Sequence, residues 1–106
     1  MKVFVDECVT YRLMPHFTRH DFTHIFDTPW RGMKNGALLR LVESKYDVFL
    51  TTDRNIPHQQ NLRKFNLALI ILYGVSNKLD DLLPLVPQTL EALDRISVGD
   101  LVIISA

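Results

Sequence analysis

The most continuous apolar run in the chain covers residues 67–72, with the sequence Leu-Ala-Leu-Ile-Ile-Leu. A strand with apolar residues at consecutive positions is buried on both faces, which is typical of the interior of a parallel sheet. Shorter runs of the same kind occur at 3–5 and 48–50. Segments with helical spacing separate these strands. The sequence therefore predicts an α/β fold, one small three-layer domain over residues 1–106, with a mainly parallel sheet of four to five strands and helices on both faces.

Apolar spacing and proline positions define the expected elements. We expect strands at Lys2–Val5, Phe22–Phe26, Asp47–Thr52, Asn66–Leu72 and Leu101–Ile104. Helices are expected at 10–17, 35–45, 57–64 and 77–96, with Pro84 and Pro87 interrupting the last one. The alternation around His24 predicts an exposed imidazole on a strand near the sheet edge. Tyr11 is expected on the buried side of the first helix, and Asn77 at the N-cap of the last.

Composition narrows the class of protein. The 106 residues are 47% hydrophobic and 23% charged, as in a soluble globular protein. The formal net charge is zero, so any affinity for nucleic acid must come from a local patch. Cys8 is the single cysteine, which excludes an internal disulfide and favours an inert, buried thiol. Because no signal peptide pattern or membrane span is found, we expect a cytoplasmic protein.

Acidic residues follow two of the expected strands. Asp6 and Glu7 come after the first strand, and Asp53 comes after the central one. If these strands are neighbours, the acids meet beyond the carboxyl ends of the strands, where parallel sheets bind ligands. Carboxylates that converge must be protonated or neutralised by a cation, and oxygen ligands favour Mg²⁺ or Mn²⁺ over zinc. Either acid alone could equally be a structural helix cap.

Basic residues near the same strand ends could flank a phosphate backbone that approaches the acids. They are Arg12, Arg31, Lys34, Arg54 and His58. Solvated loop charge explains each of them equally well when taken singly.

Several motifs resemble one family of small PIN-like proteins, and together they cover nearly the whole chain. They are Val5-Asp6-Glu7-Cys8, Lys34-Asn35-Gly36, Leu50-Thr51-Thr52-Asp53-Arg54-Asn55-Ile56-Pro57, Gln59-Gln60-Asn61-Leu62 and Ser76-Asn77-Lys78-Leu79-Asp80-Asp81-Leu82-Leu83-Pro84. Members of this family are predicted nucleases of toxin–antitoxin systems and are similar to RNA-cleaving toxins. The resemblance implies a Mg²⁺- or Mn²⁺-dependent endoribonuclease with an RNA substrate and an antitoxin protein as partner. A second copy of the chain is another candidate partner.

The same resemblance implies roles for the acids. Asp6 and Asp53 would be catalytic metal ligands, and Glu7 an auxiliary catalytic acid. The chain departs from the pattern at Ala37, where the related sequences have a glutamate. Glu43 lies almost two helical turns further on, which makes it a poor substitute. Loss of this acid would weaken the site or leave an inactive binding module.

A rival interpretation comes from signalling proteins. Asp6, Glu7 and Asp53 also resemble the acidic pocket and phosphoacceptor of a receiver domain. In that case Mg²⁺ binds and Asp53 is phosphorylated, with no nucleic acid involved. A receiver requires a lysine after the last strand of its site, and no lysine follows Lys78. It also requires a Ser or Thr at the end of the fourth strand, where this chain has Tyr73-Gly74. The PIN-like hypothesis is therefore preferred.

Overall fold

A computed structural model describes all 106 residues of the chain. Five strands form one sheet in the order β2-β1-β3-β4-β5, and every neighbouring pair is parallel. The strands are β1 (Lys2–Val5), β2 (Asp21–His24), β3 (Val48–Thr51), β4 (Ala68–Tyr73) and β5 (Leu101–Ser105). The predicted fold class is confirmed.

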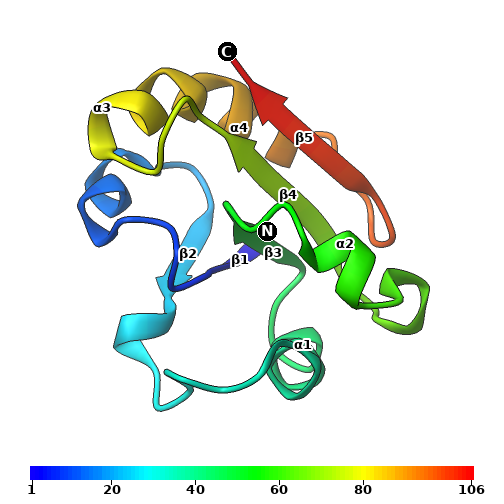
Figure 1. Cartoon of the computed structure of the whole chain (residues 1–106). Helices are drawn as coiled ribbons and strands as arrows, with labels where there is room; N and C mark the ends of the chain where they lie inside the picture. Colours follow the sequence, from blue (N-terminus) through cyan, green and yellow to red (C-terminus); the bar gives the residue numbers. More distant parts are fainter.

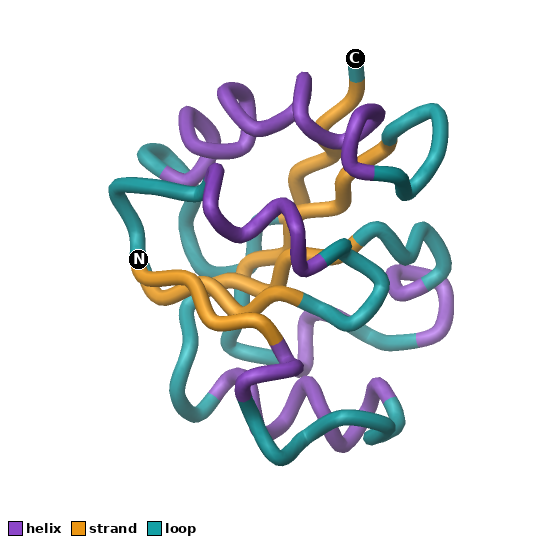
Figure 2. Tube along the Cα trace, turned by 90° about the vertical axis from the view of Figure 1, so that its left-hand side faces the viewer, coloured by secondary structure: helices purple, strands orange, loops and turns teal.

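Helices cover both faces of the sheet, as Figures 1 and 2 show from two directions at right angles. One layer contains α1 (Asn35–Glu43) and α2 (Ile56–Gln59), and the other contains α3 (Leu79–Leu82) and α4 (Val86–Leu93). Short 3₁₀ helices complete the chain at η1 (Tyr11–His16), η2 (Ile25–Asp27), η3 (Leu62–Lys64) and η4 (Leu83–Leu85). None of the helices combines the length and the apolar character that a bilayer crossing requires.

Alternate residues of each inner strand enter two separate hydrophobic cores. In β1, Val3 and Val5 face the core beneath α3 and α4, whereas Phe4 faces the core beneath α1. The same alternation continues through β3 and β4. Burial on both faces explains why these strands have continuous apolar sequences.

Proline and local capping shorten the expected helices. The predicted helix at 77–96 is divided into α3, η4 and α4, with Pro84 inside η4 and Pro87 in the first turn of α4. The predicted extent of the helix at 57–64 is wrong. It ends at Gln59 because Gln60 is extended, and the Asn61 side chain then accepts the Arg63 N–H to start η3. Such side chain to backbone hydrogen bonds compete with helix continuation.

Two predictions near the N-terminus are wrong. Tyr11 is 44% exposed, because the segment forms a 3₁₀ helix rather than an α-helix and only Leu13 of it is buried. His24 is fully buried rather than exposed. The strand ends at His24 and turns into η2, so the alternation that predicted exposure does not continue. Nδ1 of His24 accepts the Phe26 N–H at 3.1 Å, and Nε2 donates to the Val9 carbonyl at 2.7 Å. A neutral imidazole with its proton on Nε2 satisfies both contacts.

The turn before α3 also differs from the prediction. Lys78, not Asn77, occupies the N-cap position and makes no side-chain cap. The Ser76 hydroxyl accepts the Lys78 N–H and donates to Asp81. Gly74 is required here, since a Cβ atom at this position would lie 2.7 Å from the Ser76 carbonyl oxygen.

The strand order creates a reversal at the centre of the sheet. From β1 the chain crosses to β2 on one side and then to β3 on the other side. This is the 2-1-3-4-5 order of flavodoxin-like folds, in which the crevice between β1 and β3 is the usual ligand site. The acids that follow β1 and β3 lie at this crevice.

Candidate functional site

A cavity of about 330 Å³ lies at the carboxyl ends of β1 and β3. Its lining residues are Asp6, Glu7, Cys8, Ile25, Gly32, Met33, Asn35, Leu38, Thr52, Asp53 and Asn77. All three acids expected from the sequence therefore lie around one cavity. The pairing of β1 with β3 in parallel brings them there.

Asp6 is held rigidly at the base of this cavity. Only 8% of the residue is exposed. Its Oδ1 accepts the Glu7 N–H at 2.8 Å, and its Oδ2 accepts the Thr51 hydroxyl at 2.8 Å and the Cys8 thiol at 3.3 Å. Its own N–H donates to the Leu50 carbonyl at 2.9 Å, which extends the β1–β3 ladder by one residue. The carboxylate is thus fixed before any ligand arrives.

Thr51 links the two acidic positions. It is fully buried, and its Oγ1 donates to Asp6 while accepting the Asp53 N–H at 3.0 Å. In the sequence, Thr51 belonged to an expected strand and to the motif around Asp53, and no role of its own was predicted for it. Its position could have indicated this linking role, because Thr51 is the last residue of β3 and lies two residues before Asp53.

Asp53 is less constrained than Asp6. It is partly exposed, and its Oδ1 accepts the Asn55 N–H at 2.9 Å in an Asx-type turn. Its Oδ2 makes no hydrogen bond to the protein and is free for a ligand. Asn55 occupies the N-cap position of α2, but its side chain makes no cap hydrogen bond.

Cys8 is a partly buried thiol beside the acids. Burial, and then the charge of Asp6, raise the pKa of this thiol above its usual value. Its sulfur lies 3.1 Å from the Thr51 hydroxyl oxygen and 3.4 Å from the Thr52 nitrogen, which donates to it. A thiol held protonated is a poor nucleophile, so the predicted inert role agrees with its environment.

The N-terminus of α1 reaches the same cavity through Asn35 and Leu38. Lys34, at the N-cap, makes no side-chain hydrogen bond to the first turn. Uncapped N–H groups of this kind, together with the helix dipole, favour anions. Ala37, which stands where the related sequences have a glutamate, is exposed and does not line the cavity. Glu43 lies at the opposite end of α1 and accepts the Asn66 N–H at 2.9 Å, so it cannot replace an acid at 37.

None of the five predicted basic residues lines the acid cavity, although three are neighbours in sequence of residues that do. Those three are Arg31, Lys34 and Arg54. The Arg54 guanidinium lies 4.0 Å above the Tyr73 ring and donates to the Gly74 carbonyl at 3.0 Å.

The other two basic residues lie apart. Arg12 lines a separate cavity with Thr10, Asn77 and Lys78. His58 is exposed on α2.

The donors around the cavity suit a hard cation more than a soft one. Asp6 and Asp53 supply carboxylate oxygens, and Asn35 and Asn77 add amide oxygens. No group of three or more His, Cys, Asp or Glu lies close enough together to hold a metal ion. Two carboxylates with retained waters are a usual arrangement for Mg²⁺, whereas zinc sites need more nitrogen or sulfur ligands.

Comparison of the chain with protein-family models, curated proteins and solved structures found no match.

Proposed function

We propose that this chain is a metal-dependent endoribonuclease of the PIN-like type. One observation carries the proposal: Asp6 and Asp53, from adjacent parallel strands, line one cavity at the point where the strand order reverses. Open α/β sheets bind their ligands at such points. The two carboxylates would hold Mg²⁺ or Mn²⁺, Asp6 from a fixed position and Asp53 through its free Oδ2.

The residues beside the acids suit a phosphodiester. The uncapped first turn of α1 offers N–H groups to an anionic phosphate oxygen, and the exposed Lys34 adds a positive charge. Glu7 is exposed and lines the same cavity, and it would accept a proton from the attacking water. A divalent cation would supply charge neutralisation at the phosphate and lower the pKa of a bound water. Hydrolysis would add this water across one P–O bond of the RNA.

The toxin–antitoxin part of the proposal depends on the resemblance of the sequence motifs. In that system an antitoxin protein would bind the nuclease and keep it inactive. No acid of α1 lines the cavity, which leaves a cation with the carboxylates of Asp6 and Asp53, so we expect slow cleavage.

Cleavage of mixed RNAs by the purified protein tests the proposal. We expect cleavage with Mn²⁺ or Mg²⁺ and none with EDTA. Asp6→Asn and Asp53→Asn should each lower the rate by about 100-fold or more, since changes of residues behind the ligands already cost about 10–100-fold in metal sites. Asp47→Asn, which changes an acid at the other end of the sheet, is the matched control. Equal activity of all four proteins would attribute the cleavage to a contaminant.

A second candidate is a receiver-like phosphoacceptor, because the 2-1-3-4-5 strand order also occurs in receiver domains. The site lacks two parts that this chemistry needs. β4 ends at Tyr73, before Gly74, and no lysine follows Lys78. We therefore expect acetyl phosphate with Mg²⁺ to leave Asp53 unmodified in mass spectrometry. A stable adduct that is lost in Asp53→Asn would favour the receiver instead.

A further inference from the structure

Three planar side chains are stacked in a row on the surface beside β2, and we call them the planar ladder: Tyr11, Phe26 and Arg31. The Tyr11 and Phe26 rings are nearly parallel, at 13°, with centroids 6.1 Å apart. The Arg31 guanidinium carbon lies 4.3 Å from the centroid of the Phe26 ring. Tyr11 and Phe26 remain 44% and 40% exposed. The two neighbouring rings therefore present planar surface to the solvent.

Polar contacts hold the ladder in place. The Tyr11 hydroxyl donates to Oδ2 of Asp27 at 2.8 Å, and this hydrogen bond raises the pKa of the phenol. His24 packs against both rings, with centroids 5.1 Å from Tyr11 and 4.5 Å from Phe26. His24 is buried and hydrogen-bonded at both ring nitrogens. The Tyr11 and Phe26 rings therefore pack against a side chain that is itself fixed.

The ladder lies at the carboxyl edge of the sheet, beside the acid cavity. Ile25, immediately before Phe26, lines that cavity, as does Gly32, immediately after Arg31. The stacked pair Arg54–Tyr73 lies on the other side, at the end of β4. From β2 to β4 there are three strand spacings of about 4.8 Å, so these two strands lie about 14 Å apart with β1 and β3, which the acids follow, between them.

The charges around the ladder favour a polyanion despite the neutral chain. Arg12 and Arg31 are exposed, and no ion pair of the structure includes either of them. Asp27 is the acid nearest the ladder, and its Oδ2 already accepts from Tyr11. Cationic side chains interleaved with aromatic faces are the usual means by which proteins bind single-stranded nucleic acid.

We infer that the planar ladder is a subsite for an unpaired nucleobase, so that the RNA of the proposed function would pass this point as a single strand. This inference rests on the proposed nuclease function. A base would stack on the exposed planar groups of the ladder, while its phosphate backbone passes Arg12 and continues across the acid cavity toward Arg54. Bases within a duplex are already stacked on each other and cannot reach the ladder.

Binding in EDTA tests the inference separately from cleavage. The probe is a fluorescent oligouridylate, with a duplex of the same strand paired to oligoadenylate as the second arm. We expect the single strand to bind about tenfold more tightly than the duplex at the same salt concentration. Phe26→Leu keeps an apolar side chain but removes the aromatic ring. Arg31→Ala removes the planar guanidinium at the end of the ladder. Arg31→Ala should weaken single-strand binding by about tenfold, the size of one stack, and Phe26→Leu by a similar factor because the guanidinium loses the ring on which it lies.

Matched controls change comparable groups far from the ladder. Ile103→Ala alters a 50% exposed apolar residue on β5, and Arg63→Ala removes an exposed arginine of η3. Both should bind the single strand as the wild type does, and urea unfolding would verify that every variant folds. Equal binding by Phe26→Leu, Arg31→Ala and the wild type would overturn the inference, and so would equal affinity for the duplex.

The outcomes for the inference and for the proposed function are distinguishable. If the ladder variants lose binding but the wild type cleaves nothing with Mn²⁺, the subsite stands and the nuclease assignment fails. If Asp6→Asn abolishes cleavage while Phe26→Leu binds and cleaves single strands normally, the nuclease assignment stands and the subsite fails.

Discussion

Acids occur at both ends of the sheet, but their environments differ. At the amino end, three acids each accept a backbone N–H, and Glu43 and Asp47 also share a cavity with Lys2 and Lys45. Asp47 accepts from Lys2, Glu43 from Asn66, and Asp100 from Ser97, at 2.8–2.9 Å. At the carboxyl end, Asp6 is buried and shares a cavity with Asp53.

The difference shows what separates a structural acid from a candidate ligand. An exposed carboxylate that caps one loop amide loses little hydration and has no need of a cation. No lysine or arginine lines the cavity of Asp6 and Asp53, so a bound cation would meet two carboxylates without an internal counter-charge. Both groups consist of carboxylates with the same chemistry, so their position in the fold distinguishes them.

The largest expected effect concerns divalent cations. Binding to the native state alone adds about 2.7 kcal/mol to the free energy of unfolding at a concentration 100 times Kd. Mn²⁺ should therefore raise the melting temperature of the wild type, and Asp53→Asn should remove the gain. Asp47→Asn should keep it, since that acid lies at the amino end. If the melting temperature of the wild type stays the same across a wide range of Mn²⁺ concentrations, the acids at the carboxyl end of the sheet bind no cation and do not differ from those at the amino end in this respect.

The second prediction compares one acid from each end without metal. Asp6→Ala leaves the buried Thr51 hydroxyl and the Glu7 N–H without their acceptor, and such losses cost about 1–3 kcal/mol. Asp47→Ala exposes the Lys2 N–H to water, so it should cost well under about 1 kcal/mol. Urea unfolding measures both free energies. A larger loss for Asp47→Ala would show that the amino-end acids carry more of the structure.

The features that depend on local sequence pattern could be predicted from the sequence alone. Consecutive apolar residues identified β1, β3 and β4 because burial on both faces imposes that composition. The acids were placed correctly at the strand ends because they directly follow those runs.

Contacts between distant segments were beyond prediction. The burial of His24 depends on the Val9 carbonyl, 15 residues away, and the role of Thr51 depends on Asp6, 45 residues away. The orientation of Ala37 depends on how α1 packs, which no local pattern specifies.

The third prediction uses the thiol at the carboxyl end. The pKa of Cys8 is raised in the folded state, so the unfolded chain loses its proton first as the pH rises. Stability should then be constant below the unfolded pKa, near 9.0, and should fall as the pH rises toward the folded value. The slope cannot exceed about 1.4 kcal/mol per pH unit for one proton. Unfolding of Cys8→Ala in urea at increasing alkaline pH should show a shallower decline, and parallel curves would contradict the assigned cause.

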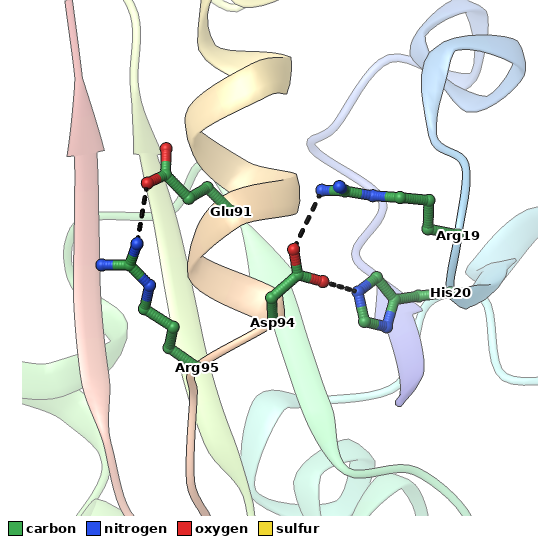
Figure 3. A network of polar contacts seen from close by, with 5 residues as sticks. All are labelled: Arg19, His20, Glu91, Asp94 and Arg95. Carbon is green, nitrogen blue, oxygen red and sulfur yellow. Dashed lines mark hydrogen bonds and ion pairs between the residues drawn. The ribbon is translucent and has the colours of Figure 1, made fainter.

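The smallest effect is expected at the amino end, in the polar network of Figure 3. Asp94, the C-cap of α4, forms an ion pair with the Arg19 guanidinium at 3.2 Å. It also contacts Nε2 of His20 at 2.9 Å, and so connects α4 to the turn before β2. The side chains of Arg19 and Asp94 are 54% and 45% exposed, and pairs this open to water contribute about 0.2–1 kcal/mol.

Asp94→Asn should therefore lower the free energy of unfolding by about 0.5 kcal/mol, and molar salt should reduce the difference further by screening the pair. Arg19→Gly is the informative companion variant. Arg19 has φ = 70°, a left-handed conformation that glycine adopts without strain. The relief of that strain offsets the lost ion pair, so Arg19→Gly should be close to neutral. A loss above about 2 kcal/mol in Asp94→Asn, insensitive to salt, would show that this exposed network stabilises the fold as strongly as the buried acids do, and the comparison between the two ends would fail.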